Sequence, residues 1–228
     1  MTSHASTTTT LADTDQKKSV HSTRSAGRKA TISKDELFEA ALKLIGPQKS
    51  ISSLSLREVT REAGIAPNSF YRHFKDIDEL AIALIDRAAV GLRQIFTEAR
   101  LKATQGQSVI RSSVEVFISQ LDADEGNLSL LLREAYTGSA SYKKAVERQL
   151  QFFEQELQED LIRLEHANNH KLQFSELVAR AITQLVFNMG ARVIDMEPNQ
   201  RTEIAEQTMI MIRILLEGAR QINPDDIR

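Results

Sequence analysis

The stretch Ser55–Phe74, SLREVTREAGIAPNSFYRHF, decides the fold of the N-terminal third of the chain. It predicts a helix, a short turn at Gly64 and a second, shorter helix that begins at Pro67, which together make a helix-turn-helix. Ser55 followed by Glu58 is the pattern of a capping box. Pro67 suits the first helical position, where its missing N–H costs nothing, and Gly64 accepts a positive φ without a Cβ penalty.

The two predicted helices divide their side chains between a buried and an exposed face. Helical spacing brings a set of apolar residues into a small core: Leu56, Val59, Ala63, Ile65, Phe70 and Phe74. The outer face of the second helix is left with Asn68, Ser69, Tyr71, Arg72 and His73, and no Asp or Glu occurs between Pro67 and Lys75. A polar, acid-free helix fits the major groove of duplex DNA. The alternative is a helix pair whose polar face is merely solvated.

Composition excludes several other classes of protein. The chain has 228 residues with a formal net charge of -2 and no cysteine, which excludes disulfide frameworks, thiol nucleophiles and thiolate metal sites. Its longest uncharged apolar stretch, residues 181–191, is shorter than the ~18 residues that cross a membrane. The N-terminus lacks the apolar segment of a secretory signal. We therefore expect a cytoplasmic protein with no membrane partner.

The sequence also lacks the common catalytic and metal-binding motifs. No phosphate-binding glycine loop, nucleophile elbow or dinucleotide fingerprint occurs in it. His166 and His170 have a spacing found in zinc sites, but no third ligand accompanies them. We predict no catalytic residue, no metal and no cofactor, and hence a protein that is not an enzyme. An all-α enzyme that carries a helix-turn-helix is the alternative.

Charge and composition divide the chain into three parts. Residues 1–30 are rich in Ser and Thr and nearly free of apolar residues, so we expect a disordered tail with a basic end at Arg28 and Lys29. Residues 1–75 carry 12 Lys+Arg against 7 Asp+Glu, a net of +5, whereas residues 76–228 carry 17 against 24, a net of -7. The predicted fold is all-α, with a three-helix helix-turn-helix domain at 31–75 and a helical domain at 76–228. Helical periodicity places further helices at 76–104, 107–121, 125–136, 140–166, 174–195 and 198–221.

The second helix and its surroundings resemble the DNA-binding domain of the TetR family of bacterial transcriptional regulators. The family signature spans this helix and the start of the next one, and here it is FYRHFKDIDEL from Phe70 to Leu80. The run SLSLREVTREAGIAPNSFYRHFKDIDEL is similar to one branch in particular, the bacterial repressors of unsaturated fatty acid synthesis that sense acyl thioesters. The likeness covers roughly residues 35–160 and weakens toward the C-terminus.

The resemblance implies a palindromic operator in double-stranded DNA as the partner, and it assigns a role to each polar residue of the motif. The implied phosphate contacts are Ser55, Arg57, Tyr71, His73 and Lys75, of which Tyr71 and His73 match a phosphate-clamping pair of the family. The implied base contacts are Asn68, Ser69 and Arg72, and the tail would reach the adjacent minor groove with Arg28 and Lys29.

The resemblance also implies a homodimer, built on the last two predicted helices. Both helices carry apolar stripes that would form a four-helix seam between two copies: Leu177, Val178, Ala181, Ile182, Leu185, Val186 and Met189 on the first, and Ile204, Thr208, Met211, Ile212, Leu215 and Ala219 on the second. Two recognition helices about 34–36 Å apart match one turn of DNA, which a single copy does not cover. The alternative is that both stripes are ordinary core within one chain.

A chamber for an effector completes what the resemblance implies. The effector would be a long-chain acyl-CoA or acyl-carrier-protein thioester, held by Leu92, Phe96, Arg111, Phe117, Leu132, Arg133 and Phe153. Core packing is the alternative for the apolar members, and a pairing with Glu115 or Glu134 is the alternative for the two arginines.

The expected function is therefore a dimeric repressor of unsaturated fatty acid biosynthesis genes. Its effector would shift the helix at 76–104 and so change the separation of the two recognition helices. Two other functions remain open at this point. One is a TetR-like repressor of an efflux or catabolic operon that responds to a hydrophobic small molecule, and the other is a non-specific architectural DNA-binding protein.

Overall fold

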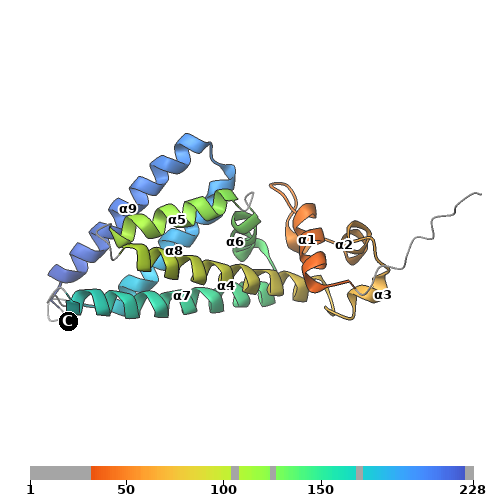
Figure 1. Cartoon of the computed structure of the whole chain (residues 1–228), viewed down its shortest axis with the longest axis horizontal. Helices are drawn as coiled ribbons and strands as arrows, with labels where there is room; N and C mark the ends of the chain where they lie inside the picture. The colour runs from red at the N-terminus through yellow and green to blue at the C-terminus, as the bar shows by residue number, and fades with distance from the viewer. Residues whose placement is uncertain (1–31, 104–107, 124–126, 168–171, 224–228) are drawn as a thin grey trace, which may run out of the picture. The chain divides into compact units, whose positions relative to one another are not determined.

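Helices account for the secondary structure of the described residues, which are 32–103, 108–123, 127–167 and 172–223 of this computed structural model (Figure 1). No β-strand occurs among them, so the all-α prediction is confirmed for this part of the chain. The predicted tail, with Arg28 and Lys29, lies outside the described residues.

Short helices lead into long ones along the chain. The N-terminal helices are α1 (Lys34–Leu44), α2 (Leu56–Glu62) and α3 (Pro67–Phe70), with the 3-10 helix η1 (Ile51–Ser53) between α1 and α2. The long helices are α4 (Ile77–Ala103), α5 (Val109–Ala123), α6 (Asn127–Thr137), α7 (Ala140–Ala167), α8 (Ser175–Arg192) and α9 (Pro198–Gln221), and the 3-10 helix η2 (Val193–Asp195) follows α8. The bounds predicted from the sequence for the long helices agree with these to within a few residues.

Capping boxes start both α1 and α2. Ser33 Oγ accepts a hydrogen bond from the Glu36 backbone N–H at 3.2 Å, and the Glu36 carboxylate accepts one from the Ser33 N–H at 2.9 Å. The same reciprocal pair occurs in α2, where Ser55 Oγ accepts from the Glu58 N–H at 3.3 Å and the Glu58 carboxylate accepts from the Ser55 N–H at 2.9 Å. Each box satisfies two backbone donors that the helix itself leaves unpaired, which fixes where the helix begins.

The N-terminal helices share one apolar core. Val59 and Phe70 are fully buried, and the Phe74 ring lies 5.6 Å from the Phe38 ring and 5.8 Å from the Phe70 ring between centroids. The remaining predicted core residues are half-buried against it, namely Leu56, Ala63 and Ile65. The core continues onto α6 and α7 through Leu131, Tyr142, Ala145 and Val146. The helix-turn-helix therefore packs directly on the helices that follow it, which the division at residue 75 did not anticipate.

A second core joins the helices α4 to α9. In Figure 1 the long helices α4 and α7 run side by side, and α8 packs against α6, α7 and α9. Four phenylalanine rings stand at the centre of this core: Phe96, Phe117, Phe153 and Phe187. Their centroids are 4.9 to 5.9 Å apart in contacting pairs, which is the usual range for attractive ring contacts.

The apolar stripes of α8 and α9 divide between the chain's own core and its surface. Seven of the residues expected at a dimer seam are buried inside the chain: Val178, Ile182, Val186, Met189, Thr208, Ile212 and Ala219. Their burial agrees with the alternative of ordinary core within one chain. Other apolar side chains of the two helices are exposed, with Leu177 at 60%, Ile210 at 57% and Ile214 at 65%. The homodimer stays a prediction, and Leu177 and Ile214 belong to its candidate face.

Candidate nucleic-acid interface and effector cavity

The turn between α2 and α3 depends on Gly64. Its φ of +66° is the left-handed conformation that the sequence predicted, and a Cβ at this position would meet no atom within 4 Å. The backbone conformation and not the available space therefore demands glycine. The N–H of Ile65 donates to the Thr60 carbonyl at 2.9 Å across this residue, which closes the end of α2 and sets the direction of α3.

The polar face of α3 and the turn after it is open to solvent. Asn68, Tyr71 and Arg72 are exposed, and Tyr71 is the most exposed aromatic side chain of this region at 58%. Ser69 is half-buried. The regular helix ends at Phe70, and the next three residues continue as turns in which the Phe74 N–H still donates to the Phe70 carbonyl at 3.1 Å. The structure therefore brings the predicted base contacts together on one exposed surface.

His73 has a contact that the sequence did not predict. It is half-buried, and its Nε2 lies 2.8 Å from the carbonyl oxygen of Ile32, just before α1. A carbonyl only accepts, so the ring donates through Nε2 and ties the start of α1 to the end of α3. In the neutral ring Nδ1 then carries no proton, and only the imidazolium has a donor left for a phosphate. His73 is thus a positioning residue of this interface, and its phosphate contact stays a prediction.

The other implied phosphate contacts differ in whether their side chains have a hydrogen-bond donor available. The Ser55 hydroxyl donates to the Glu58 carboxylate at 2.8 Å, so its proton is already used inside the capping box. Arg57 and Lys75 have exposed side chains. The Lys75 backbone N–H donates to the Glu79 carboxylate at 2.7 Å at the start of α4, which leaves its ammonium group available. We therefore regard Arg57 and Lys75 as better candidates than Ser55 for a phosphate contact.

The surroundings of Glu58 change the acidity of its carboxyl group clearly. The Lys49 ammonium donates to its carboxylate at 2.7 Å, and Ser55 donates to it from its backbone N–H and its hydroxyl. These hydrogen bonds lower the pKa of Glu58 from its ordinary value of 4.5 to about 2, and the bond from Lys49 has the largest effect. Because the ionised form is favoured in the folded chain, the contribution of Glu58 to stability is present above the ordinary pKa and is lost as the pH falls through the lowered one.

We expect the variant Glu58→Gln to be less stable than wild type at neutral pH and to lose that difference in acid. The difference should shrink as the pH falls through about 4.5 toward about 2, because the wild-type carboxylate becomes protonated over that window. Urea unfolding of both proteins at a series of pH values measures it. A difference that stayed constant down to the lowest pH would mean that the charge of Glu58 does not contribute.

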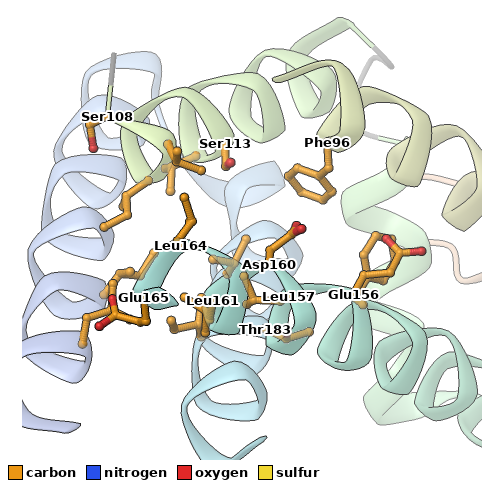
Figure 2. A pocket seen from close by; sticks show the side chains of 18 of the residues that line it. Phe96, Ser108, Ser113, Glu156, Leu157, Asp160, Leu161, Leu164, Glu165 and Thr183 are labelled. Atoms are coloured by element: carbon orange, nitrogen blue, oxygen red, sulfur yellow. The ribbon is translucent and has the colours of Figure 1, made fainter. Parts of the chain in front are cut away.

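A hollow of the described chain lies between α4, α5, α7, α8 and α9. Its volume is about 470 Å³, within the range of about 300–1,000 Å³ of small-molecule sites. Its wall is mostly apolar and includes Phe96, Val109, Ile110, Val114, Phe153, Leu157, Leu161, Ile182, Val186, Phe187, Ile212 and Leu216. Figure 2 shows Phe96 of α4 and Asp160 of α7 pointing into this space. A long apolar chain or a compact hydrophobic molecule fits such a cavity.

Three charged groups of the cavity wall, Asp160, Glu165 and Arg220, form ion pairs within the chain. Glu165 is 5% exposed, and its two carboxylate oxygens accept from the Arg220 guanidinium at 3.2 and 2.5 Å. Arg220 also donates to Glu217 at 2.7 Å, and the bonds from these carboxylates, above all from Glu165, raise the pKa of the guanidinium. Asp160 pairs with Arg163. The charges in the wall are therefore balanced mainly by contacts within the chain.

The structure places two of the seven predicted effector residues on the cavity wall, Phe96 and Phe153. Leu92, Phe117 and Leu132 are buried in the surrounding core instead, as the alternative of core packing expects, and their contact with an effector stays a prediction. The residues that the sequence missed come from α8 and α9, whose inward stripes had been assigned to the dimer. Their apolar spacing was visible, but it does not tell whether the neighbour is the same chain or a second copy.

The two predicted arginines lie outside the cavity wall. Arg111 is exposed and pairs with Glu115 at 3.1 Å one turn along α5, which is one of the alternatives the sequence left open. Arg133 on α6 pairs with Asp195 at 3.3 Å and donates to the Pro47 carbonyl at 3.2 Å. Its partner is therefore neither of the two glutamates considered. Arg133 joins α6 to the loop before η1 and has no contact with the cavity.

The described residues hold no group of three or more His, Asp or Glu side chains that would bind a metal ion. None of the helices among them combines the length and the apolar character needed to cross a membrane. His170, considered above as a zinc ligand, lies outside the described residues.

Comparison with known proteins shows which family model and which solved structures this chain is similar to. Residues 37–84 match the family model of the bacterial regulatory proteins of the tetR family. Three solved regulators named FadR share the fold. The Bacillus halodurans fatty acid degradation regulator has a TM-score of 0.62 and 16% identity, over 82% of this chain and 96% of its own. The Thermus thermophilus repressor, solved with lauroyl-CoA, has a TM-score of 0.61 and 20% identity, over 84% and 98% of the two chains.

The third, the Bacillus subtilis regulator solved with stearoyl-CoA, has a TM-score of 0.61 and 14% identity, over 82% of this chain and 99% of its own. Identities at this level show a common fold and no more. The match of the family model falls on α1 to α4, where the helix-turn-helix lies. Residues 37–84 thus match the N-terminal domain of the tetR family of bacterial regulatory proteins, and the described chain as a whole shares the fold of these solved structures.

Proposed function

We propose that the protein is a dimeric transcriptional repressor that binds a palindromic operator and responds to a long-chain acyl thioester. The observation that carries the DNA-binding part is the exposed, acid-free face of α3, held by the Gly64 turn above a fully buried Phe70. A rigid polar helix of this kind presents donors and acceptors to the base edges of the major groove. Such a protein would act in the cytoplasm and would need no catalytic group.

Substitutions on this surface separate base contacts from phosphate contacts. We expect Arg72→Ala to weaken binding to the preferred operator by about 1–3 kcal/mol and to relax the preference at one base position. Lys75→Ala should weaken binding to all duplexes alike and reduce the slope of log affinity against log salt by about one. Fluorescence anisotropy on an operator selected from random DNA, and on a scrambled duplex, measures both. Equal effects of the two variants on both duplexes would overturn the assigned roles.

The exposed apolar residues of α8 and α9 support the dimer. Leu177 on α8 and Met211 and Ile214 on α9 are between 39% and 65% exposed, although each would gain from burial. The two helices also pack on one another, so the residues lie on adjoining elements. A second copy placed on the same face would bury them around a two-fold axis, the usual symmetry of such assemblies.

The cavity supports the effector. Its size and apolar wall suit an acyl chain, and solved proteins of the same fold are complexes with lauroyl-CoA and stearoyl-CoA. The resemblance of the helix-turn-helix to repressors of unsaturated fatty acid synthesis narrows the proposed target genes to that process. A hydrophobic small molecule from an efflux or catabolic system would fill the same space. Native mass spectrometry of protein purified from its host distinguishes these two effectors by the mass of the retained molecule.

Contacts on both sides of α6 provide a route between the cavity and the DNA-binding face. On the cavity side, the Ser129 hydroxyl of α6 donates to the Gly190 carbonyl of α8 at 2.7 Å, and Gly190 lies against the Phe117 ring. On the other side, Arg133 donates to the Pro47 carbonyl at 3.2 Å, and the buried Glu134 accepts from Ser52 of η1. A displacement of α8 by an effector would thus reach the segment that positions α2.

Thermodynamic linkage limits how much an effector can change the affinity for DNA through this route. An effector changes DNA affinity only by the difference in its own affinity for the two arrangements of the helices, typically about 1–3 kcal/mol. The helix α4 offers a second route, because it begins in the N-terminal core and contributes Phe96 to the cavity. Both routes join the same two sites, so they would act together.

A further inference from the structure

A second hollow adjoins the effector cavity at the start of α5. It has a volume of about 180 Å³ and lies between α5 and α9, lined by Ser108, Ile110, Arg111, Glu206, Met209, Ile210 and Arg213. Ser108 and Ile110 also line the large cavity, so the two hollows share this edge. Figure 2 shows Ser108 at the rim of the large cavity, where α5 begins. The two hollows are therefore neighbours at the start of α5.

The lining of the small hollow carries more positive than negative side chains. Two of its lining residues are arginines, against the single carboxylate of Glu206. Arg213 is exposed and forms no ion pair or side-chain hydrogen bond with another described residue. Arg111 pairs with Glu115, but both side chains are more than half exposed, and such a pair on one helix is weak and screened by salt. Both guanidinium groups are thus available to a stronger anionic partner.

The start of α5 strengthens this preference for an anion. Its first turn contains no acidic residue, so the positive end of the helix dipole is not offset by a side chain there. The large cavity offers no comparable cation, because its wall residue Arg220 is bound by Glu165 and Glu217. The apolar chamber and the cationic hollow are consequently separate in space and adjacent to one another.

We propose that the hollow between α5 and α9 binds a phosphate group in the head of the acyl effector, with Arg111 and Arg213 as its ligands, which rests on the proposed function above. The planar guanidinium forms two parallel hydrogen bonds with a phosphate, and phosphate stays charged at neutral pH. The protein then responds to an acyl thioester that carries a phosphate, and binds the same chain poorly when the phosphate is missing.

Calorimetric titration with two thioesters of the same chain tests this on the full-length protein. Lauroyl-coenzyme A carries phosphates, and S-lauroyl-N-acetylcysteamine carries none. Wild type should bind the first about tenfold or more tightly than the second. The double variant Arg111→Gln, Arg213→Gln should lose most of this preference and keep its affinity for the N-acetylcysteamine thioester, which also reports that the cavity is intact.

Lys143→Gln, Lys144→Gln is the matched control, since it removes two positive charges from exposed residues near the start of α7. It should keep the wild-type preference. A preference that survives in the double arginine variant would overturn the assignment of this hollow while leaving the effector cavity in place. The absence of binding by either thioester in wild type would overturn both the hollow and the proposed effector.

Discussion

Replacing Phe70 with alanine is expected to lower the free energy of unfolding by about 3–5 kcal/mol and to abolish operator binding. Phe70 is 0% exposed, and its ring contacts those of Phe74 and Tyr71 at centroid distances of 5.8 and 6.0 Å. Truncation would leave a void directly under the surface that is proposed to enter the major groove. A protein of this kind has a total stability of only about 5–15 kcal/mol, so the loss is a large part of it.

Urea unfolding at a fixed protein concentration measures the effect, since dimerisation makes stability depend on concentration. Phe152→Ala is a matched control that removes the same side chain from a site that is 46% exposed. It should cost less than about 1 kcal/mol and leave DNA binding unchanged. Similar losses in both variants would mean that Phe70 is not the support of the DNA-binding surface.

Gly190→Ala is expected to destabilise the protein by about 1–3 kcal/mol and to weaken effector binding. A Cβ on Gly190 would lie 2.7 and 2.8 Å from atoms of the Phe117 ring and 3.2 Å from Leu132. The Phe117 ring is fully buried and contacts Phe96 and Phe187, both of which line the cavity. The methyl group can be accommodated only if these rings move, and such movement changes the shape of the cavity.

Gly91→Ala provides a control of opposite sign. A Cβ at Gly91 would meet nothing within 4 Å, and the residue lies inside α4. Alanine should therefore stabilise the protein by about 0.5–1 kcal/mol, because it restricts the unfolded chain and favours the helix. Thermal unfolding of the two variants at one concentration compares them. Stabilisation of the protein by Gly190→Ala would show that the close approach to Phe117 imposes no constraint.

Local signals in the sequence were sufficient for the helix-turn-helix. The capping box of Ser55 and Glu58, the positive φ of Gly64 and the helix start at Pro67 each depend on residues a few positions apart, and all are confirmed. These features depend on which backbone groups lack a hydrogen-bond partner and on which dihedral angles are allowed. Residues close in the sequence determine both. The burial of Phe70 and Phe74 followed from the same short-range spacing.

Long-range contacts could not be predicted in this way. The bond of His73 to the Ile32 carbonyl spans 41 residues, and the pairing of Arg133 with Asp195 spans 62. Each depends on how separate helices pack, whereas the sequence suggested Glu115 or Glu134 as the partner of Arg133. The position of the predicted effector residues relative to the cavity depends on the same long-range packing. Helical spacing shows that Phe117 is on an apolar face, but it does not show whether that face borders a cavity or solid core.

Titration of an acyl thioester against operator binding tests the central claim that the cavity and the DNA-binding surface are coupled. The affinity for the selected operator is measured by anisotropy at fixed salt and at rising concentrations of a long-chain acyl-CoA. We expect the operator affinity to change by about 5–150-fold and then to level off when the cavity is full. An operator affinity that stays constant while calorimetry shows the thioester bound would contradict the coupling.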